Sequence, residues 1–173
     1  MESIADIWGL AADKWDEVMD QVSDDDWTKA TPCDDWSVRE LVDHAMFWQG
    51  RGGGVFGADV EEDAGWATLR TALQAALSDP ANLEGTAEAL GGMPKQAVAG
   101  LITADLLVHS WDLARAIGAD DTLPEAAVTS TLTGLQRIPE AMLRSDRMFG
   151  PAVEVADGAN TQDALIAFVG RTP

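Results

Sequence analysis

The chain has 173 residues, 46% of them hydrophobic, and its 30 acidic against 11 basic residues give a formal net charge of −19. This length and apolar content suffice for one folded domain, expected over residues 1–173, and exclude wholesale disorder. So acidic a surface repels nucleic-acid phosphates and anionic lipid, so neither nucleic acid nor a membrane is an expected partner. The single cysteine excludes an intramolecular disulfide, and with no signal-peptide or transmembrane run we expect a cytoplasmic protein.

Two amphipathic helices are predicted in the first part of the chain. Residues 3–22 carry apolar side chains at helical spacing along one stripe, which indicates a helix packed against a core. A second helix is predicted over residues 37–49, because Ser37 and Glu40 form a capping box ahead of a new apolar stripe. We expect the glycines at positions 50 and 52–54 to end this helix.

A long connection precedes the next two predicted helices. Residues 50–93 are Gly-rich and acidic with one short helical pattern, which is far longer than the usual link between adjacent bundle helices. We therefore expect a crossover that lets the next helix, residues 94–118, run parallel to the second. A further helix begins near Pro124, with Pro139 expected to kink or split it, and a short helix follows at 161–169. Together these patterns predict an all-α, up-down-down-up four-helix bundle with a long crossover between the second and third bundle helices.

Three polar residues share the inward face of the helix predicted over 94–118. Asp105, His109 and Asp112 follow a spacing of four and then three residues, which places them one above another among apolar neighbours. A buried carboxylate costs several kcal/mol unless it is paired, hydrogen-bonded or bound to a metal. Asp105 has no basic residue three or four positions away, so its partner must come from another element.

The two histidines of the chain, His44 and His109, both lie on or beside an apolar helix stripe. With Asp105 they offer two imidazoles and one carboxylate, the ligand set of catalytic zinc sites that keep one coordination position open. The same set matches the facial triad of non-haem Fe(II) enzymes. The alternative is an ordinary one, since a histidine on a helix flank or an Asp-x-x-x-His pair is commonly a satisfied core residue or a helix-surface contact.

Two motifs add a resemblance to a known family, TPCDDWSVRELVDHAMFW and, further along, TADLLVHSWDLARAIG. They resemble the DinB-like metal-binding superfamily, in the branch typified by the N-terminal domain of mycothiol-dependent maleylpyruvate isomerase. The closing FGPAVEVADGANTQDALIAFVGRTP is similar to the tail of that branch's short, single-domain members. The resemblance implies a DinB-like four-helix bundle with a divalent metal on His44, Asp105 and His109. The isomerase has Glu where this chain has Asp105, and the resemblance does not reach its additional C-terminal domain, so isomerase activity is not carried over.

The resemblance also implies cofactors and a class of function. One divalent metal is expected, zinc first, with nickel or iron as alternatives, and a low-molecular-weight thiol such as mycothiol is an expected partner beside a small-molecule substrate. The function that this favours is a metal-dependent enzyme of the thiol transferase or isomerase type. The alternative is a non-catalytic metal-bound module that binds a small molecule or assembles a dimer. Whether the protein is an enzyme, which thiol and electrophile it uses, and whether it forms a homodimer do not follow from the sequence.

Further residues are weaker candidates for the surroundings of the site. Trp48 and Arg51 lie beyond His44 on the second helix, and Asp112 with Arg115 is expected to form a helix ion pair that could brace the ligands. Cys33 precedes the second helix, where the helix dipole could lower the pKa of its thiol, although an ordinary packed thiol is the commoner case. Residues 50–65 are a candidate lid over the site, with an ordinary solvent loop as the alternative.

Overall fold

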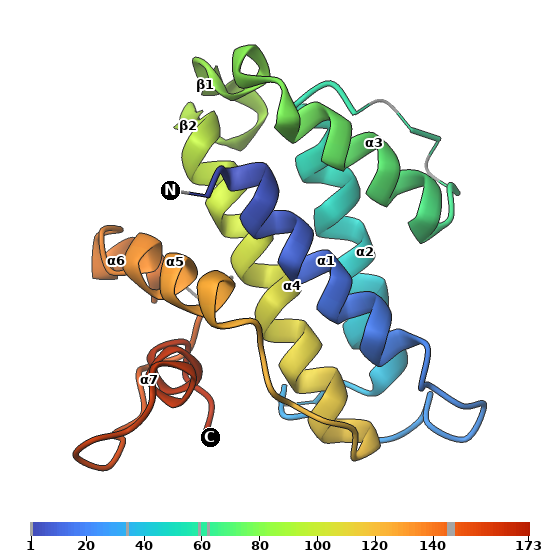
Figure 1. Ribbon diagram of the computed structural model, residues 1–173, viewed down its shortest axis with the longest axis vertical. Coiled ribbons are helices and arrows are strands. Elements are labelled where there is room, and N and C mark those ends of the chain that lie inside the picture. Colours follow the sequence, from blue (N-terminus) through green and yellow to red (C-terminus); the bar gives the residue numbers. More distant parts are fainter. Residues whose placement is uncertain (1, 34, 59, 62, 145–147) are drawn as a thin grey trace.

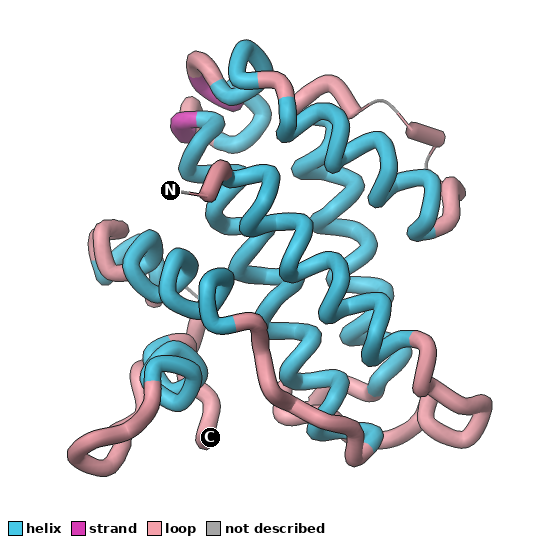
Figure 2. The backbone as a smooth tube through the Cα atoms, viewed as in Figure 1, coloured by secondary structure: helices cyan, strands magenta, loops and turns pink. Residues whose placement is uncertain are grey.

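The computed structural model describes residues 2–33, 35–58, 60–61, 63–144 and 148–173 and is mostly helical (Figures 1 and 2). Its helices are α1 (Ile4–Met19), α2 (Val38–Val55), α3 (Trp66–Ser78), α4 (Lys95–Ile117), α5 (Glu125–Leu135), α6 (Glu140–Leu143) and α7 (Thr161–Phe168). Two 3-10 turns, η1 (Pro80–Leu83) and η2 (Glu88–Leu90), and an antiparallel pair of short strands, β1 (Thr86–Ala87) and β2 (Met93–Pro94), lie between α3 and α4. The prediction of an all-α bundle is confirmed.

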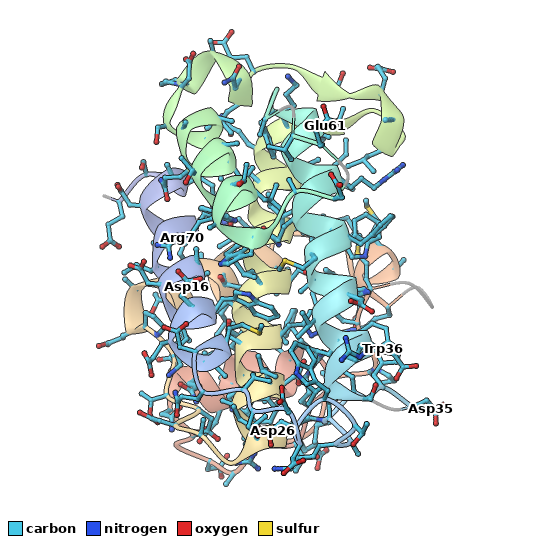
Figure 3. All side chains as sticks on the ribbon, turned by 90° about the vertical axis from the view of Figure 1, so that its right-hand side faces the viewer. Asp16, Asp26, Asp35, Trp36, Glu61 and Arg70 are labelled. Atoms are coloured by element: carbon cyan, nitrogen blue, oxygen red, sulfur yellow. The ribbon has the colours of Figure 1, made fainter. Side chains whose placement is uncertain are left out.

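The bundle is formed by α1, α2, α3 and α4. In Figure 1, α1 and α4 run downward whereas α2 and α3 run upward, which is the up-down-down-up order. Arg70 of α3 forms an ion pair with Asp16 near the end of α1, and the two side chains point toward one another in Figure 3. Near the start of α1, the Gln74 amide of α3 donates to the carbonyl of Ala5 at 3.2 Å, so α1 and α3 are antiparallel neighbours.

The prediction that residues 50–93 form a crossover to a helix parallel to α2 is wrong. The helix of residues 95–117 runs antiparallel to α2, because Gln49 of α2 contacts Ile102 while the earlier residue His44 contacts the later residue Asp105. The third position of the bundle belongs to α3, which follows α2 after residues 56–65 alone. The physical reason is that α3 buries its own apolar stripe, Leu69, Leu73 and Leu77, against α1 and α2 and is therefore part of the core.

The prediction that the glycines at positions 50 and 52–54 end the second helix is also wrong. The helix continues to Val55, and Gly52 and Gly53 are buried within it. A Cβ atom placed on Gly52 would lie 2.7 Å from Cγ2 of Ile102, so the glycine lets α2 approach α4 closely. The helix ends at Val55, and Gly57, two residues beyond, has a φ of 80°, a conformation that residues with a side chain rarely adopt.

The centre of the bundle is α4, which packs against α1, α2 and α5. By length and composition α4 is apolar enough to span a membrane, but 78% of its most apolar stretch is buried inside the protein. The buried position in a bundle therefore accounts for this composition.

The C-terminal part lies along one side of the bundle, beside α4 and away from β1 and β2 (Figure 1). As predicted, Pro139 splits the helical pattern here, because α5 ends at Leu135 and α6 begins at Glu140. The helix α7 packs against α5, and the Gln162 side chain ties it to the linker that follows α4. This amide accepts from the backbone N–H of Leu123 at 2.8 Å and donates to the carbonyl of Asp121 at 3.0 Å.

The close approach of α2 and α4 predicts opposite effects for two glycine substitutions. Gly52→Ala should lower the free energy of unfolding by about 1–3 kcal/mol, because the added methyl group overpacks against Ile102. Gly50→Ala, where nothing lies within 4 Å of the added atom, should be neutral or stabilise by about 0.5–1 kcal/mol. Urea unfolding followed by circular dichroism measures both, and equal effects would contradict the assigned helix contact.

Candidate metal centre

The structure brings His44, Asp105 and His109 together at the contact of α2 with α4. The Oδ1 atom of Asp105 lies 3.3 Å from Nε2 of His44 and 3.4 Å from Nε2 of His109. The two imidazole rings are 5.0 Å apart and nearly perpendicular. Each of the three residues offers one possible ligand atom, and these three atoms all lie within 4.8 Å of one another. The antiparallel packing of α2 and α4 allows this meeting, since it places His44 beside the middle of α4, where Asp105 and His109 lie.

The second carboxylate oxygen of Asp105 marks an incomplete set of contacts. Oδ2 is buried and has no hydrogen-bond partner among the described residues. Burial alone would raise the pKa of Asp105, but attraction to His109 and hydrogen bonds with both imidazoles bring this pKa below its ordinary value. Burial would likewise lower the pKa of His109, yet Asp105 and the other hydrogen-bond partners raise it well above 6.5.

This set of atoms fits a divalent metal. Two imidazole nitrogens and a carboxylate are the ligands of catalytic zinc sites, and a buried oxygen without a partner is the atom that a cation would satisfy. The side chains of His44 and Asp105 are 26% and 20% exposed, whereas that of His109 is 7% exposed. The group is therefore reachable from solvent on the side of His44 and Asp105, as a site with an open coordination position requires.

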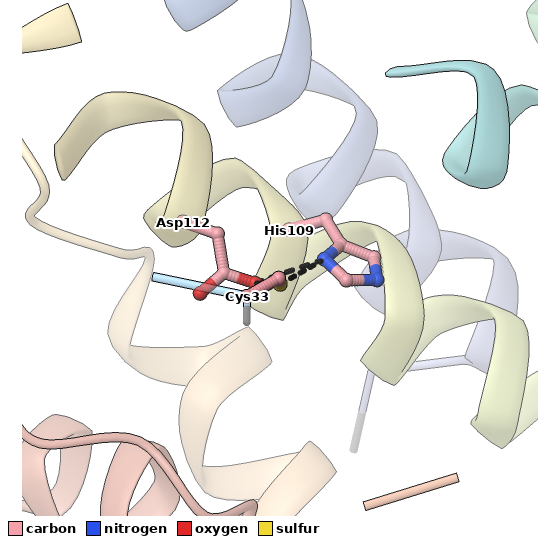
Figure 4. A group of neighbouring side chains, drawn as sticks. All are labelled: Cys33, His109 and Asp112. Atoms are coloured by element: carbon pink, nitrogen blue, oxygen red, sulfur yellow. Dashed lines mark hydrogen bonds and ion pairs between the residues drawn. The ribbon is translucent and has the colours of Figure 1, made fainter. Parts of the chain in front are cut away.

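Polar contacts also fix the side of the His109 ring that faces away from Asp105, at its Nδ1 atom. Its Nδ1 atom lies 2.9 Å from Oδ2 of the fully buried Asp112, and Figure 4 shows these side chains with Cys33. Arg171 forms a two-pronged ion pair with Asp112, with Nε 3.1 Å from Oδ1 and Nη2 2.8 Å from Oδ2. Burial would raise the pKa of Asp112, but hydrogen bonds from His109 and Arg171 and the charge of Arg171 lower it to about 2.

Cys33 takes part in the same polar contacts. Its thiol donates to Oδ2 of Asp112 at 3.2 Å and lies 3.9 Å from Nδ1 of His109 (Figure 4). Cys33, His109 and Asp112 thus form a second group with the spacing of metal ligands. Nη2 of Arg171 lies 3.3 Å from the sulfur, however, so a permanent cation already neutralises this group and opposes a metal there.

Aromatic rings lie beside the two histidines of the site. The Trp36 ring lies 4.5 Å from the His44 ring and 6.0 Å from the His109 ring, and Trp48 lies 6.4 Å from His44. Trp36 comes from the loop just before α2 and is seen beside the first turns of that helix in Figure 3. Phe47 is 59% exposed and contacts Trp48 at 5.4 Å, which extends the apolar rim to the surface.

Several predicted neighbours of the site lie elsewhere. Arg51 is exposed, and no hydrogen bond or ion pair within the described part of the chain joins it to the three candidate ligands. Arg115 pairs with Asp121 at 3.1 Å instead of Asp112 and lies over the Trp111 ring. The candidate lid at 50–65 is partly the end of α2, and Phe56 is buried in the core.

Two residues of the site, Trp36 and Arg171, escaped the sequence analysis. The available signal for Arg171 was indirect, because a buried Asp112 needs a cation and the sequence does not show which arginine reaches it. Trp36 lies next to the Ser37 cap, so its position over His44 follows only once α2 is placed against α4. Both depend on contacts between residues distant in the sequence.

The all-α bundle agrees with the fold that the sequence motifs imply, and His44, Asp105 and His109 lie together where α2 meets α4. Residues 8–64 match the family described as "Mycothiol maleylpyruvate isomerase N-terminal domain". The predicted resemblance to this branch is therefore confirmed. The matched segment contains His44 and Trp48, whereas Asp105 and His109 lie beyond it.

Other similarities cover nearly the whole chain. The protein is 29% identical over 171 residues to "Uncharacterized protein Rv0738" and to "Uncharacterized protein MT0763" of two Mycobacterium tuberculosis strains. Each alignment covers 94% of this chain and 94% of the relative. No solved structure matches the chain.

Because Asp112 is held ionised in a buried ion pair, Asp112→Asn should destabilise the protein more at neutral pH than in acid. The pKa of Asp112 is lowered from 3.8 to about 2, so the stability it contributes is complete above pH 3.8 and is lost as pH falls through about 2. This pH-dependent part corresponds to about 2 kcal/mol, in addition to the cost of leaving Arg171 unpaired. Urea unfolding of metal-depleted wild type and variant at pH 7 and pH 3 should show a smaller difference at pH 3. The exposed Asp43→Asn is the control, and a difference that grows toward pH 3 would contradict the assignment.

Proposed function

We propose that the protein binds one divalent metal at His44, Asp105 and His109, zinc first, with nickel and iron as alternatives. We further propose that it is a cytoplasmic enzyme that acts with a low-molecular-weight thiol such as mycothiol. The observation that carries the proposal is the convergence of two imidazole Nε2 atoms on one carboxylate that retains a buried oxygen without a partner. The similarity of residues 8–64 to the mycothiol-dependent family supports the choice of thiol.

The residues of the chain prepare the site in three ways. Asp112 accepts the Nδ1–H of His109, which leaves the lone pair of Nε2 directed to the open side. Asp105 supplies negative charge beside both imidazoles. Trp36 and Trp48 limit the access of water and offer an apolar wall to the carbon skeleton of a substrate. A bound divalent metal would supply Lewis acidity, which lowers the pKa of a thiol and so favours its nucleophilic form.

The proposed reaction is of the transferase or isomerase type. The thiol, held at the open side of the site, would attack an electrophilic small molecule, and the aromatic rim favours an electrophile with an apolar part. His44, at 26% exposure, is the site residue best placed to meet both reactants.

The alternative function is a non-catalytic metal-bound module. The exposed Phe47 on the outer face of α2 favours it, because an aromatic residue open to solvent suits contact with a second protein chain, including a homodimer. In this alternative the metal would stabilise the α2–α4 contact, and thiols would not bind at the site.

Metal content is the first test of the proposal. Protein purified without a His tag and saturated with zinc should retain one metal per chain, measured by elemental analysis and native mass spectrometry. The double variant Asp105→Ala, His109→Ala should retain less than a tenth of this amount, because two of the three ligands are removed. The exposed Asp43→Ala should retain all of it. Full metal content in the double variant would refute the assigned ligands.

Thiol binding separates the enzyme from the structural module. Calorimetry with mycothiol should show binding to metal-loaded protein and at least tenfold weaker binding to metal-depleted protein, because the open side of the site binds the thiol only when the metal is present. Trp48→Ala should weaken thiol binding or turnover while leaving metal content unchanged. Equal thiol binding with and without metal would favour the alternative function.

A further inference from the structure

We propose that Arg171 is a positioning residue of the metal centre, because its guanidinium fixes the carboxylate that holds His109. The inference rests on the proposed function, in which His109 is a ligand, and it makes the C-terminal tail part of the site. Arg171 acts through Asp112 and lies behind His109, on the side opposite the open position.

The first argument is the geometry of the ion pair. Nε and Nη2 of Arg171 bind the two oxygens of Asp112 separately, at 3.1 and 2.8 Å, so the guanidinium fork fixes both the position and the rotation of the carboxylate. The Asp112 side chain is fully buried and that of Arg171 is 14% exposed. A buried carboxylate costs several kcal/mol without a partner, so the pair is a structural requirement of the interior.

The second argument is where the fixed carboxylate points. Its Oδ2 atom, bound by Arg171, is also the atom that lies 2.9 Å from Nδ1 of His109. A carboxylate behind a histidine fixes the ring orientation and leaves the other nitrogen available to a metal. Without the guanidinium fork, the carboxylate is free to rotate away from Nδ1, and the His109 ring loses its fixed direction.

The third argument is that the tail is shaped to deliver this arginine. Gly170 has a φ of 89°, and an added Cβ would lie 3.1 Å from the backbone of Gly150 and Pro151, so only glycine fits this turn after α7. The backbone N–H of Arg171 donates to the carbonyl of Ile166 at 3.0 Å, and the Nη1 atom of its side chain donates to the carbonyl of Val169 at 3.1 Å. The turn thus directs the side chain from the surface of α7 to the rear of α4.

A second arginine provides a matched control. Arg144 is 16% exposed, close to the 14% of Arg171, and it also secures the tail. Its Nη1 atom donates to the carbonyls of Gly150 and Phe168, both at 2.8 Å, but its contacts lie away from Asp112. Loss of Arg144 therefore loosens the same segment without removing the contact to the site.

The experiment compares Arg171→Gln, Arg171→Lys and Arg144→Gln in the full-length protein. Zinc affinity, measured by competition with a chromogenic chelator where all variants are folded, should fall 10- to 100-fold in Arg171→Gln. Arg171→Lys should recover part of the loss, because the charge returns without the fork, and Arg144→Gln should bind zinc like the wild type. In an Asp112→Asn background, Arg171→Gln should cause no further loss. Unchanged affinity in folded Arg171→Gln, or an equal loss in Arg144→Gln, would overturn the inference.

A measurement on metal-free protein separates this inference from the proposed function. The ¹⁵N chemical shift of Nδ1 in His109 should change in Arg171→Gln and should keep its wild-type value in Arg144→Gln. The reason is that Arg171, and not Arg144, fixes the carboxylate that is hydrogen-bonded to that nitrogen. A wild-type protein that binds no divalent metal would refute the proposed function, and the NMR comparison would still decide whether Arg171 positions His109. Identical spectra in wild type and Arg171→Gln would overturn the positioning role.

Discussion

Two carboxylates on the most buried helix of the protein are the constraint on which the site depends. Asp105 and Asp112 lie on α4 among apolar side chains, where an uncompensated charge is expensive. Three residues compensate these charges: His109 from α4 itself, His44 from α2 and Arg171 from the C-terminal tail. The C-terminal segment is therefore bound to the bundle by electrostatics as well as by apolar packing.

The two carboxylates differ in how far this compensation goes. Both oxygens of Asp112 have partners, and its strongly lowered pKa reflects a group kept ionised by Arg171 and His109. Asp105, whose side chain is 20% exposed, retains one buried oxygen, Oδ2, without a partner among the described residues. A satisfied carboxylate serves structure, whereas an unsatisfied one is the feature expected where a ligand completes the contacts. The contrast assigns different roles to two residues of the same type on the same helix.

Local patterns in the sequence were sufficient for much of the fold. The capping box at Ser37 and the apolar stripes predicted helices over 3–22, 37–49 and 94–118, which correspond to α1, most of α2 and α4, and Pro139 predicted the break between α5 and α6. The spacing of Asp105 and His109 predicted that they share a face, because this depends on helix geometry alone. What failed depended on tertiary contacts. Gly52 looks like a helix end in the sequence, and only the proximity of Ile102 shows its role in packing.

The same limit explains the errors around the site. Arg115 was the nearest cation to Asp112 in sequence, yet it turns outward to Asp121, while Arg171 reaches Asp112 across 59 residues of chain. The direction of α4 relative to α2 was also mistaken, because α3 was taken as part of a connection. His44 still meets Asp105 in the antiparallel arrangement, since both residues lie near the middle of their helices.

The contact of Gly52 with Ile102 has a consequence for the metal site proposed between α2 and α4. Ile102 lies one helical turn before Asp105, and Gly52 lies on the same helix as His44, so the close helix contact that Gly52 permits brings His44 toward Asp105 and His109 on α4. Ions of different radius require different gaps, and a bundle with larger residues at this contact would present the same ligands farther apart. For a metal bound at the proposed site, glycine at position 52 would therefore help to set which ion size fits, although it donates no atom to the ion.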